Sequence, residues 1–303
     1  MTDAFSWKDG ERTIHFGRGR LADAPGILGE RYTLLTTPRV LPMARAVADR
    51  AAEVHEVPSG RVDDLAAALV SEVDPDAPLI VALGGGRVID TAKAIAALHG
   101  TRAAAIPTTL SAAEMTWVHR LPADAPADTR RVRPQIVIND PTLSASQPLE
   151  ELAASAANSL GHAIEGAVTT LASPVPRMAG AEAVRLIAAA YSTEIDDDAR
   201  DMLALGALLA GYAIDSAWYG LHHVVSQTLV RLAGAGHGPA NATMLPHTSA
   251  WLAEQRGGVT DEAIALAKAR SEDAFRRAAE ADSGRTRAAS GAEVARKARS
   301  LLR

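Results

Sequence analysis

The chain has 303 residues, no cysteine, a formal net charge of −5 and 48% hydrophobic residues. That length holds one large or two ordinary domains, and the missing cysteine excludes disulfides and thiolate metal sites. The negative charge argues against a nucleic-acid partner. Met1–Phe16 lacks a signal-peptide pattern, and the longest apolar run, Met202–Ile214, is too short to cross a bilayer. We therefore expect a cytoplasmic protein with no membrane partner.

Short apolar runs alternate with helical patterns through the first half of the chain. The expected strands are Arg12–Gly17, Tyr32–Thr37, Val54–Val57, Leu79–Leu83, Ala103–Ile106 and Gln135–Ile138. The expected helices between them are Val40–Val54 and Val62–Val73, and Trp117–Arg133 is expected to be a surface hairpin or loop. This alternation predicts a mainly parallel sheet that is covered by helices on both faces.

Strand patterns end near residue 147, and alanine-rich helical periodicity follows. We expect an α/β domain over 1–147 and a helical domain over 148–303. The expected helices of the second domain are Pro148–Leu171, Arg177–Tyr191, Ala199–Tyr212, Trp218–Leu232, Asp261–Ala281 and a final helix after Gly291.

A glycine turn, Gly84-Gly85-Gly86, joins the run Leu79–Leu83 to the helical pattern that follows it. Three glycines allow the backbone to approach a ligand closely. The helix that begins there offers unpaired N–H groups and the positive end of its dipole. A diphosphate fits such a site, although a glycine turn without a ligand would look the same in isolation.

A second segment, Ile106-Pro107-Thr108-Thr109-Leu110 through Glu114-Met115-Thr116, lies downstream of the glycine turn. Together the two segments resemble the iron-containing, group III alcohol dehydrogenase family, and the Glu-Met-Thr ending is especially similar to its maleylacetate reductase branch. The resemblance runs from about Ile14 to about Trp251. It implies a Rossmann-like parallel-sheet domain followed by a helical domain, in a dehydroquinate synthase-like architecture. Reductases of this branch usually continue for several more helices, so the C-terminal part reads as shortened.

The resemblance also implies which residues bind NAD or NADP. The glycine turn would take the pyrophosphate, and the threonines after the next strand would take phosphate or ribose. The implied cofactor-binding residues are Thr36, Thr37, Gly84, Gly85, Gly86, Asp90, Lys93, Thr108, Thr109 and Leu110. NAD-selective members often end the second strand in Thr-Asp. Here Thr37 is followed by Pro38-Arg39, so no carboxylate repels the extra phosphate of NADP.

Histidines gather in the second domain, where four of the nine fall between residues 222 and 247. Asn158 and His162 lie four residues apart, on one face of the expected helix. The family's metal positions correspond to Asn158, His162, His223 and His237. Adjacent helical residues point about 100° apart, so His222 and His223 cannot both face one ion. The resemblance assigns His223 and His237 to the catalytic site, with His222 contacting substrate or supporting its neighbour.

Two residues depart from the family pattern. Asn158 stands where most members carry a carboxylate, although the maleylacetate reductase branch also has asparagine there. Three imidazoles would suit Zn²⁺ and, less firmly, Fe²⁺. Gln227 replaces a histidine, and glutamine cannot relay a proton near neutral pH. The histidines could therefore bind an anionic substrate and polarise its carbonyl without a metal.

We interpret the chain as an NAD(P)-dependent oxidoreductase that transfers hydride between the nicotinamide and a carboxylate-bearing alcohol or ketone, in a cleft between its domains. The substrate would be a small oxo-dicarboxylate. An alternative is a tailoring dehydrogenase that oxidises a β-hydroxy acid, such as a peptide's C-terminal threonine, with loss of CO₂. From another class, the chain could be a cofactor-binding homologue without catalysis. We also expect a homodimer.

Overall fold

The computed structural model describes residues 3–192, 194–233 and 237–256, and it leaves out the side chains of residues 231, 233, 237–239 and 256. Contacts divide the chain into two compact units. The first contains Met1–Gln147 together with Ile195–Ala204, and the second contains the remainder. The two helices expected after Asp261 lie outside the described residues.

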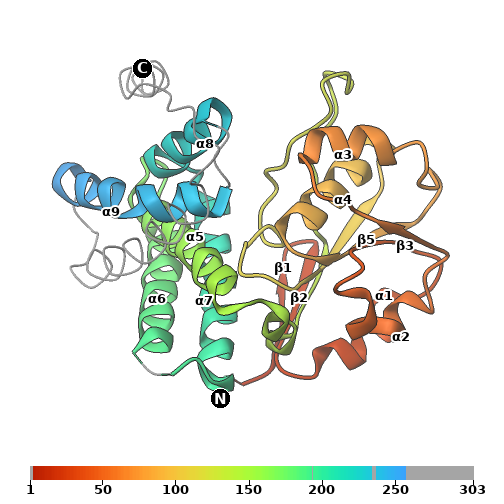
Figure 1. The fold of residues 1–303 in the computed structure, drawn as a ribbon, viewed down its shortest axis with the longest axis horizontal. Coiled ribbons are helices and arrows are strands. Elements are labelled where there is room, and N and C mark those ends of the chain that lie inside the picture. The colour runs from red at the N-terminus through yellow and green to blue at the C-terminus, as the bar shows by residue number, and fades with distance from the viewer. Residues whose placement is uncertain (1–2, 193, 234–236, 257–303) are drawn as a thin grey trace. The chain divides into compact units, whose positions relative to one another are not determined.

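The first unit contains a seven-stranded sheet in the order β1-β2-β7-β6-β5-β3-β4 (Figure 1). All neighbours pair in parallel except β1 and β2, which form an antiparallel hairpin. The strands are β1 Phe5–Asp9, β2 Arg12–Phe16, β3 Thr33–Thr36, β4 Glu53–Glu56, β5 Leu79–Gly84, β6 Arg102–Pro107 and β7 Ile136–Asn139. The predicted parallel sheet is confirmed, and each of the six expected strands appears within two residues of its expected ends.

Helices cover both faces of this sheet, as the alternation predicted (Figure 1). The strand β5 shows the two faces directly. Its Ile80 and Ala82 belong to the core cluster with α3 (Val62–Leu69) and α4 (Gly86–His99). Its alternate residues Val81 and Leu83 belong to the cluster with α1 (Ala24–Leu28) and α2 (Arg45–Ala48). A continuous apolar run is therefore needed, because both sides of this strand are buried.

The helix expected over Val40–Val54 is wrong in its extent. A short 3-10 helix, Leu41–Ala44, carries Pro42 in its first turn and leads into α2, which ends at Ala48. The break falls at Ala44, whose backbone (φ −134°, ψ 44°) is not helical. The hairpin strand β1 was not predicted, because it has only five residues, of which Phe5 and Trp7 alone are apolar, and all five are half-buried or exposed.

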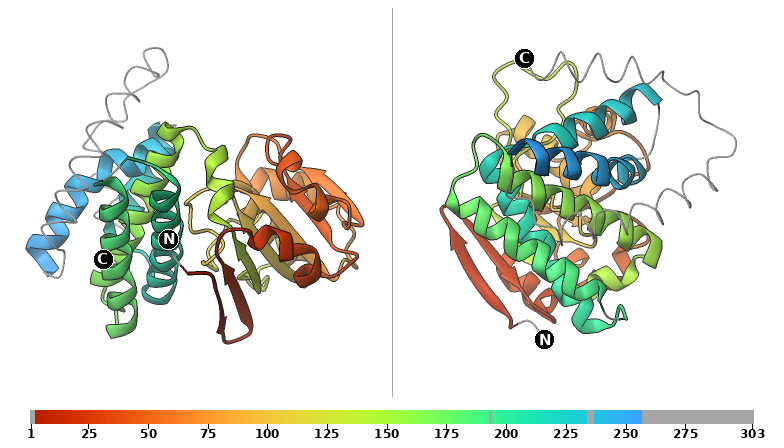
Figure 2. Two further views of the ribbon diagram at one scale, coloured as in Figure 1. Left: turned by 90° about the horizontal axis from the view of Figure 1, so that it is seen from below. Right: turned by 90° about the vertical axis from the view of Figure 1, so that its left-hand side faces the viewer.

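The second unit is helical (Figure 2). Its helices are α5 Leu149–Val168, α6 Pro174–Tyr191, α7 Asp197–Ala217, α8 Leu221–Ala233 and α9 His237–Arg256. The first turns of α7 belong to the first unit, where Arg18 Nη2 meets Asp201 Oδ1 at 2.8 Å. Helix α5 packs against α6, α8 and α9, so its side chains are shared among three neighbours.

Among the described helices, none alone is long and apolar enough to span a membrane. The pair formed by α7 and the segment Leu221–Val230 would pass on length and composition, but it is bent by 101°.

Candidate functional site

Three neighbouring strands of the first unit end at the same edge of the sheet, and each is followed by residues expected to bind the cofactor. In the register of β5 and β6, Gly84 lies opposite Pro107. Thr108, the next residue, donates its backbone N–H to Gly84 O at 3.0 Å. Strand β3 lies on the other side of β5. Thr36, Gly84–Gly86 and Thr108–Leu110 therefore meet at the carboxyl edge, where ligands of such sheets bind.

The glycine turn is packed so closely that side chains would not fit. A Cβ at Gly85 would lie 2.9 Å from Thr109 Cγ2, and one at Gly84 would lie 2.8 Å from a methyl of Val88. Helix α4 begins at Gly86, and its N-cap residue is Gly85, which has no side chain to cap the first N–H groups. This open N-terminus beside a glycine turn fits the diphosphate of a dinucleotide.

The threonines at this edge have different surroundings. Thr36 Oγ1 donates to Leu83 O at 2.9 Å, so its hydroxyl is engaged within the sheet. Thr108 is almost fully buried, and its Oγ1 has no hydrogen-bond partner among the described residues. A buried hydroxyl normally has a partner, so Thr108 is the threonine whose surroundings best fit a bound ligand.

Asp90 and Lys93 form a pair on α4. Lys93 is fully buried, and its Nζ lies 2.7 Å from Asp90 Oδ1. The same ammonium donates to Ala113 O at 3.1 Å and to Val118 O at 3.0 Å. Lys93 therefore fixes the segment that follows the cofactor threonines. These three acceptors match the three N–H groups of the ammonium, which favours a structural rather than a ligand-binding role.

Glu114 lies within that segment and is almost fully buried. Its Oε2 has no hydrogen-bond partner in the part of the chain that the structure describes. Burial raises the pKa of Glu114 to about 7, against a smaller lowering effect of Lys93. Its carboxyl group therefore titrates near neutral pH.

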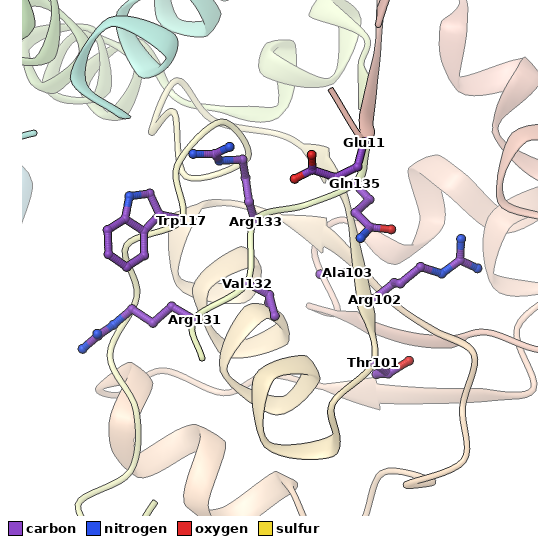
Figure 3. Close-up of a pocket in the computed structure, with 9 residues that line it drawn as sticks. All are labelled: Glu11, Thr101, Arg102, Ala103, Trp117, Arg131, Val132, Arg133 and Gln135. Carbon is purple, nitrogen blue, oxygen red and sulfur yellow. The ribbon is translucent and has the colours of Figure 1, made fainter. Parts of the chain in front are cut away.

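An open pocket of about 360 Å³ lies at the opposite, amino-terminal edge of the sheet. Arg102, Arg131, Arg133 and Gln135 contribute to its lining (Figure 3). Figure 3 shows the side chains of Arg102 and Arg131 pointing in opposite directions, so they do not converge on one anion. Because it lies away from the glycine turn, we do not assign this pocket to the cofactor.

In the second unit, α5 and α8 bring two of the expected histidines together. The rings of His162 and His223 are parallel, with an interplanar angle of 5° and a centroid distance of 4.6 Å. Both side chains are largely buried. His223 Nδ1 lies 2.5 Å from Oε2 of Glu165, one turn beyond His162 on α5. Burial alone would raise the pKa of Glu165, but the adjacent His223 and His222 rings lower it overall, so the carboxylate is ionised.

His222 lies beside this pair but is oriented differently. Its ring is edge-on to His223, at 89° and 5.1 Å, and is 1% exposed. Its Nδ1 lies 2.9 Å from Thr248 Oγ1. A Cβ at Gly161 would come within 2.7 Å of its Nε2, so the ring is packed directly under α5. This placement favours a supporting role over direct contact with substrate.

Asn158, the residue at the expected carboxylate position, is paired with another amide. Its Oδ1 accepts a hydrogen bond from Asn241 Nδ2 at 2.8 Å, and Asn241 is fully buried on α9. The amide oxygen of Asn158, which would have to bind a metal, therefore already accepts a hydrogen bond from Asn241. The side chain of His237 lies outside the described residues, so its place in the cluster is not part of this geometry.

Asn158, His162 and His223, the members of the expected metal set whose side chains the structure describes, do not by themselves form a divalent metal site. Within the described ranges, no three His, Asp, Glu or Cys side chains are grouped so as to hold an ion. The nearest carboxylate, Glu165, accepts from backbone and imidazole N–H groups of α8. We therefore derive no chemical step through a metal.

An aromatic pair precedes α8. The rings of Trp218 and Tyr219 stack at 5.0 Å, and Tyr219 lies 6.3 Å from His223. Trp218 has a positive φ of 61°, a strained conformation for a bulky residue that is often found at functional sites. It is 37% exposed.

Sequence reasoning did not assign a role to Glu165, Thr248 or Asn241. For Glu165 a signal was available, because a carboxylate three residues after His162 on an apolar helix needs a buried partner. Thr248 and Asn241 lie on α9, which was not predicted as a helix. Its sequence has Pro246 inside and almost no apolar periodicity.

A parallel sheet with a glycine turn at its carboxyl edge, together with a helical unit that holds buried histidines, is the construction of a nucleotide-dependent oxidoreductase. Comparisons identify the family. Two protein-family sequence models match the chain. The family model "Iron-containing alcohol dehydrogenase" matches residues 11–141, and the family model "Fe-containing alcohol dehydrogenase family, C-terminal" matches residues 152–303. The chain belongs to the iron-containing alcohol dehydrogenase family.

Several proteins to which the chain is similar are maleylacetate reductases. The chain is 33% identical to maleylacetate reductase 2 of Cupriavidus pinatubonensis, over 78% of this chain and 71% of that protein. It is 32% identical to a maleylacetate reductase of Sphingobium indicum, over 78% and 72% respectively. The crystal structure of maleylacetate reductase from Agrobacterium tumefaciens matches with a TM-score of 0.76 and 27% identity, covering 92% of this chain and 85% of that one. The chain is accordingly an NAD(P)-dependent oxidoreductase.

The close packing of the glycine turn yields a test of cofactor binding. Gly85→Val should abolish NAD(P)H binding, because the added side chain collides with Thr109 and fills the approach to the N-terminus of α4. Titration by nicotinamide fluorescence measures it. Gly26→Val is the control, since a Cβ at the exposed Gly26 meets nothing within 4 Å. Unchanged affinity in the Gly85 variant would contradict this assignment of the cofactor edge.

The buried carboxyl group of Glu114 should make stability depend on pH. An acid whose pKa is raised on folding, here from 4.5 to about 7, destabilises the fold progressively as pH rises through that window. Glu114→Gln removes this effect. Its gain in unfolding free energy over the unmodified protein should grow between pH 5 and pH 8 to a few kcal/mol, on the order of 3.

Urea unfolding at both pH values measures this gain, with the exposed Glu30→Gln as control. A gain that is equal at the two pH values would show that Glu114 titrates normally.

Proposed function

We propose that this oxidoreductase transfers hydride between NAD(P)H and a small carboxylate-bearing ketone, as the maleylacetate reductases to which it is similar are named for doing. The parallel pair of His162 and His223, supported by the ionised Glu165, carries the proposal. Nε2 of His223 is buried and has no hydrogen-bond partner among the described residues. An imidazole nitrogen in that state suits the oxygen of a substrate carbonyl or carboxylate.

On the cofactor side, NAD or NADP supplies or accepts the hydride when bound. Gly84, Gly85 and Gly86 would take the pyrophosphate at the start of α4, and Thr108 and Thr109 the adjacent phosphate or ribose. Asp90 and Lys93 would support this edge by fixing the segment after Thr109 rather than by touching the cofactor. Thr37-Pro38-Arg39 offers no carboxylate against a 2′-phosphate, so we expect both cofactors to be accepted.

On the substrate side, we assign different tasks to the histidines. His223 would interact with the reacting oxygen, and His162 would hold its ring plane by stacking. His222 would support His223 from the side, because it is packed between Gly161 and Thr248. His237 follows from the family pattern as a further substrate contact.

The alternative functions have less support. Similarity to several maleylacetate reductases does not favour a peptide-tailoring dehydrogenase. The ordered arrangement of His162, His222 and His223 around Glu165 argues against a cofactor-binding homologue without catalysis. A homodimer and a cytoplasmic location remain predictions.

The substrate class can be tested by comparing kcat/KM for maleylacetate, a simple alcohol and a peptide that ends in threonine, with NAD(H) and NADP(H). Maleylacetate should be better than the simple alcohol by about 10²-fold or more, because hydrogen bonds to a charged group contribute about 1.5–3 kcal/mol each. If the simple alcohol proved best, an ordinary alcohol dehydrogenase would replace the proposal. If the peptide proved best, a tailoring dehydrogenase that oxidises a C-terminal threonine would replace the proposal.

The metal content can be tested at Asn158. We expect the purified protein to hold little divalent metal and to keep most of its activity with a chelator, because Asn158 supplies a neutral amide. Asn158→Asp should raise the affinity for Zn²⁺ or Fe²⁺ by restoring an anionic ligand. Elemental analysis and titration measure both. Stoichiometric metal in the unmodified protein, with activity lost on chelation, would show that the histidines suffice.

A further inference from the structure

Glu165 is a buried carboxylate that makes three contacts with the start of α8. It lies on α5, is 1% exposed, and faces the first turn of α8. Its Oε1 accepts the backbone N–H of His222. Its Oε2 lies 3.4 Å from the backbone N of His223 and 2.5 Å from Nδ1 of the same residue. One carboxylate therefore caps the N-terminus of α8 and contacts the ring of its third residue.

These contacts fix the hydrogen on the His223 ring. An ionised carboxylate only accepts hydrogen bonds, so the nitrogen at 2.5 Å must carry the hydrogen. In the neutral ring Nε2 is then bare, and in the charged ring Nε2 carries the second hydrogen. In both states Nε2 is the nitrogen that can exchange a proton.

The ring has little freedom to escape this arrangement. His162 stacks on one face, at 4.6 Å and 5°, and His222 approaches edge-on, at 5.1 Å and 89°. A flip of the ring would place the carbon Cδ2 against Glu165, and a change of tautomer would place a bare nitrogen there. The carboxylate would then lose its shortest side-chain contact while remaining buried, which is costly.

We propose that Glu165 is a positioning residue for the reaction, because it keeps the hydrogen on Nδ1 of His223 and so leaves Nε2 as the proton-exchanging atom that faces the substrate oxygen. This inference rests on the proposed function of His223. The step it supports is balanced: as hydride reaches the ketone carbon, the oxygen takes a proton from Nε2, and the neutral ring keeps its Nδ1 hydrogen bond to Glu165.

The variant Glu165→Gln separates this role from simple capping. The glutamine oxygen can still accept the N–H of His222, which leaves the amide NH₂ facing Nδ1 of His223. The opposite orientation would set NH₂ against the N–H of His222, the shorter of the two backbone contacts. Nδ1 must then become the acceptor, and the ring hydrogen moves to Nε2. The cap is largely kept, but the tautomer is reversed.

The experiment reads the tautomer directly. Nitrogen-15 spectra of histidine-labelled protein at pH 8 report which ring nitrogen carries hydrogen, with the His223 signals identified by their loss in His223→Asn. We expect Nδ1–H in the unmodified protein and Nε2–H in Glu165→Gln. With maleylacetate, kcat should fall by about 10²-fold or more, as for a wrong tautomer in other His-dependent enzymes. The affinity for NAD(P)H should not change.

The control is Glu151→Gln, the same chemical change at an exposed position of α5, which should alter neither the tautomer nor kcat. An unchanged His223 tautomer in Glu165→Gln, or a kcat within about twofold of the unmodified protein, would overturn the proposal. If the unmodified protein reduced no carboxylate-bearing ketone, the proposed function would fail separately, and the spectra would still decide whether Glu165 sets the tautomer.

Discussion

The buried carboxylate of Glu165 is the constraint on which the helical unit depends. A carboxylate without solvent must find donors, and those nearest to it lie in the first turn of α8. This requirement fixes where α8 begins relative to α5, and it sets the rotation of α8 about its own axis. The rotation in turn decides which of the two adjacent histidines stacks on His162 and which is packed beneath Gly161. The carboxylate of Glu165 thus sets the arrangement of His162, His222 and His223.

A buried cation has the corresponding role in the α/β unit. Lys93 lies on the helix that the glycine turn opens, and it donates to carbonyls of the segment after Thr109. The glycine turn touches that segment from the other side, where Gly85 has no room for a Cβ beside Thr109. Helix, turn and segment are therefore fixed together. The edge that would hold the cofactor is therefore fixed by contacts within the chain itself, which is the arrangement that preorganised binding uses.

Local sequence patterns predicted most strands of the sheet. A strand that is buried on both faces must be a continuous apolar run, as β5 is. Features set by distant partners were not predictable. The strand β1 pairs through a hairpin with few apolar residues, and residues 195–204 return to the first unit through ion pairs such as Arg18–Asp201. At the site, the histidines were found from family position. The partners that orient them, Glu165 and Asn241, depend on how α8 and α9 meet α5, which no local pattern encodes.

The position of negative charge distinguishes this cluster from a metal centre. Where a family member has a carboxylate at the Asn158 position, that charge would offset a cation bound by the histidines. Here Asn158 is a neutral amide paired with Asn241, while the carboxylate of Glu165 lies behind His223, against Nδ1. A neutral amide at position 158 does not repel an anion. The same change that weakens a cation site is therefore compatible with the carboxylate-bearing substrate that we propose.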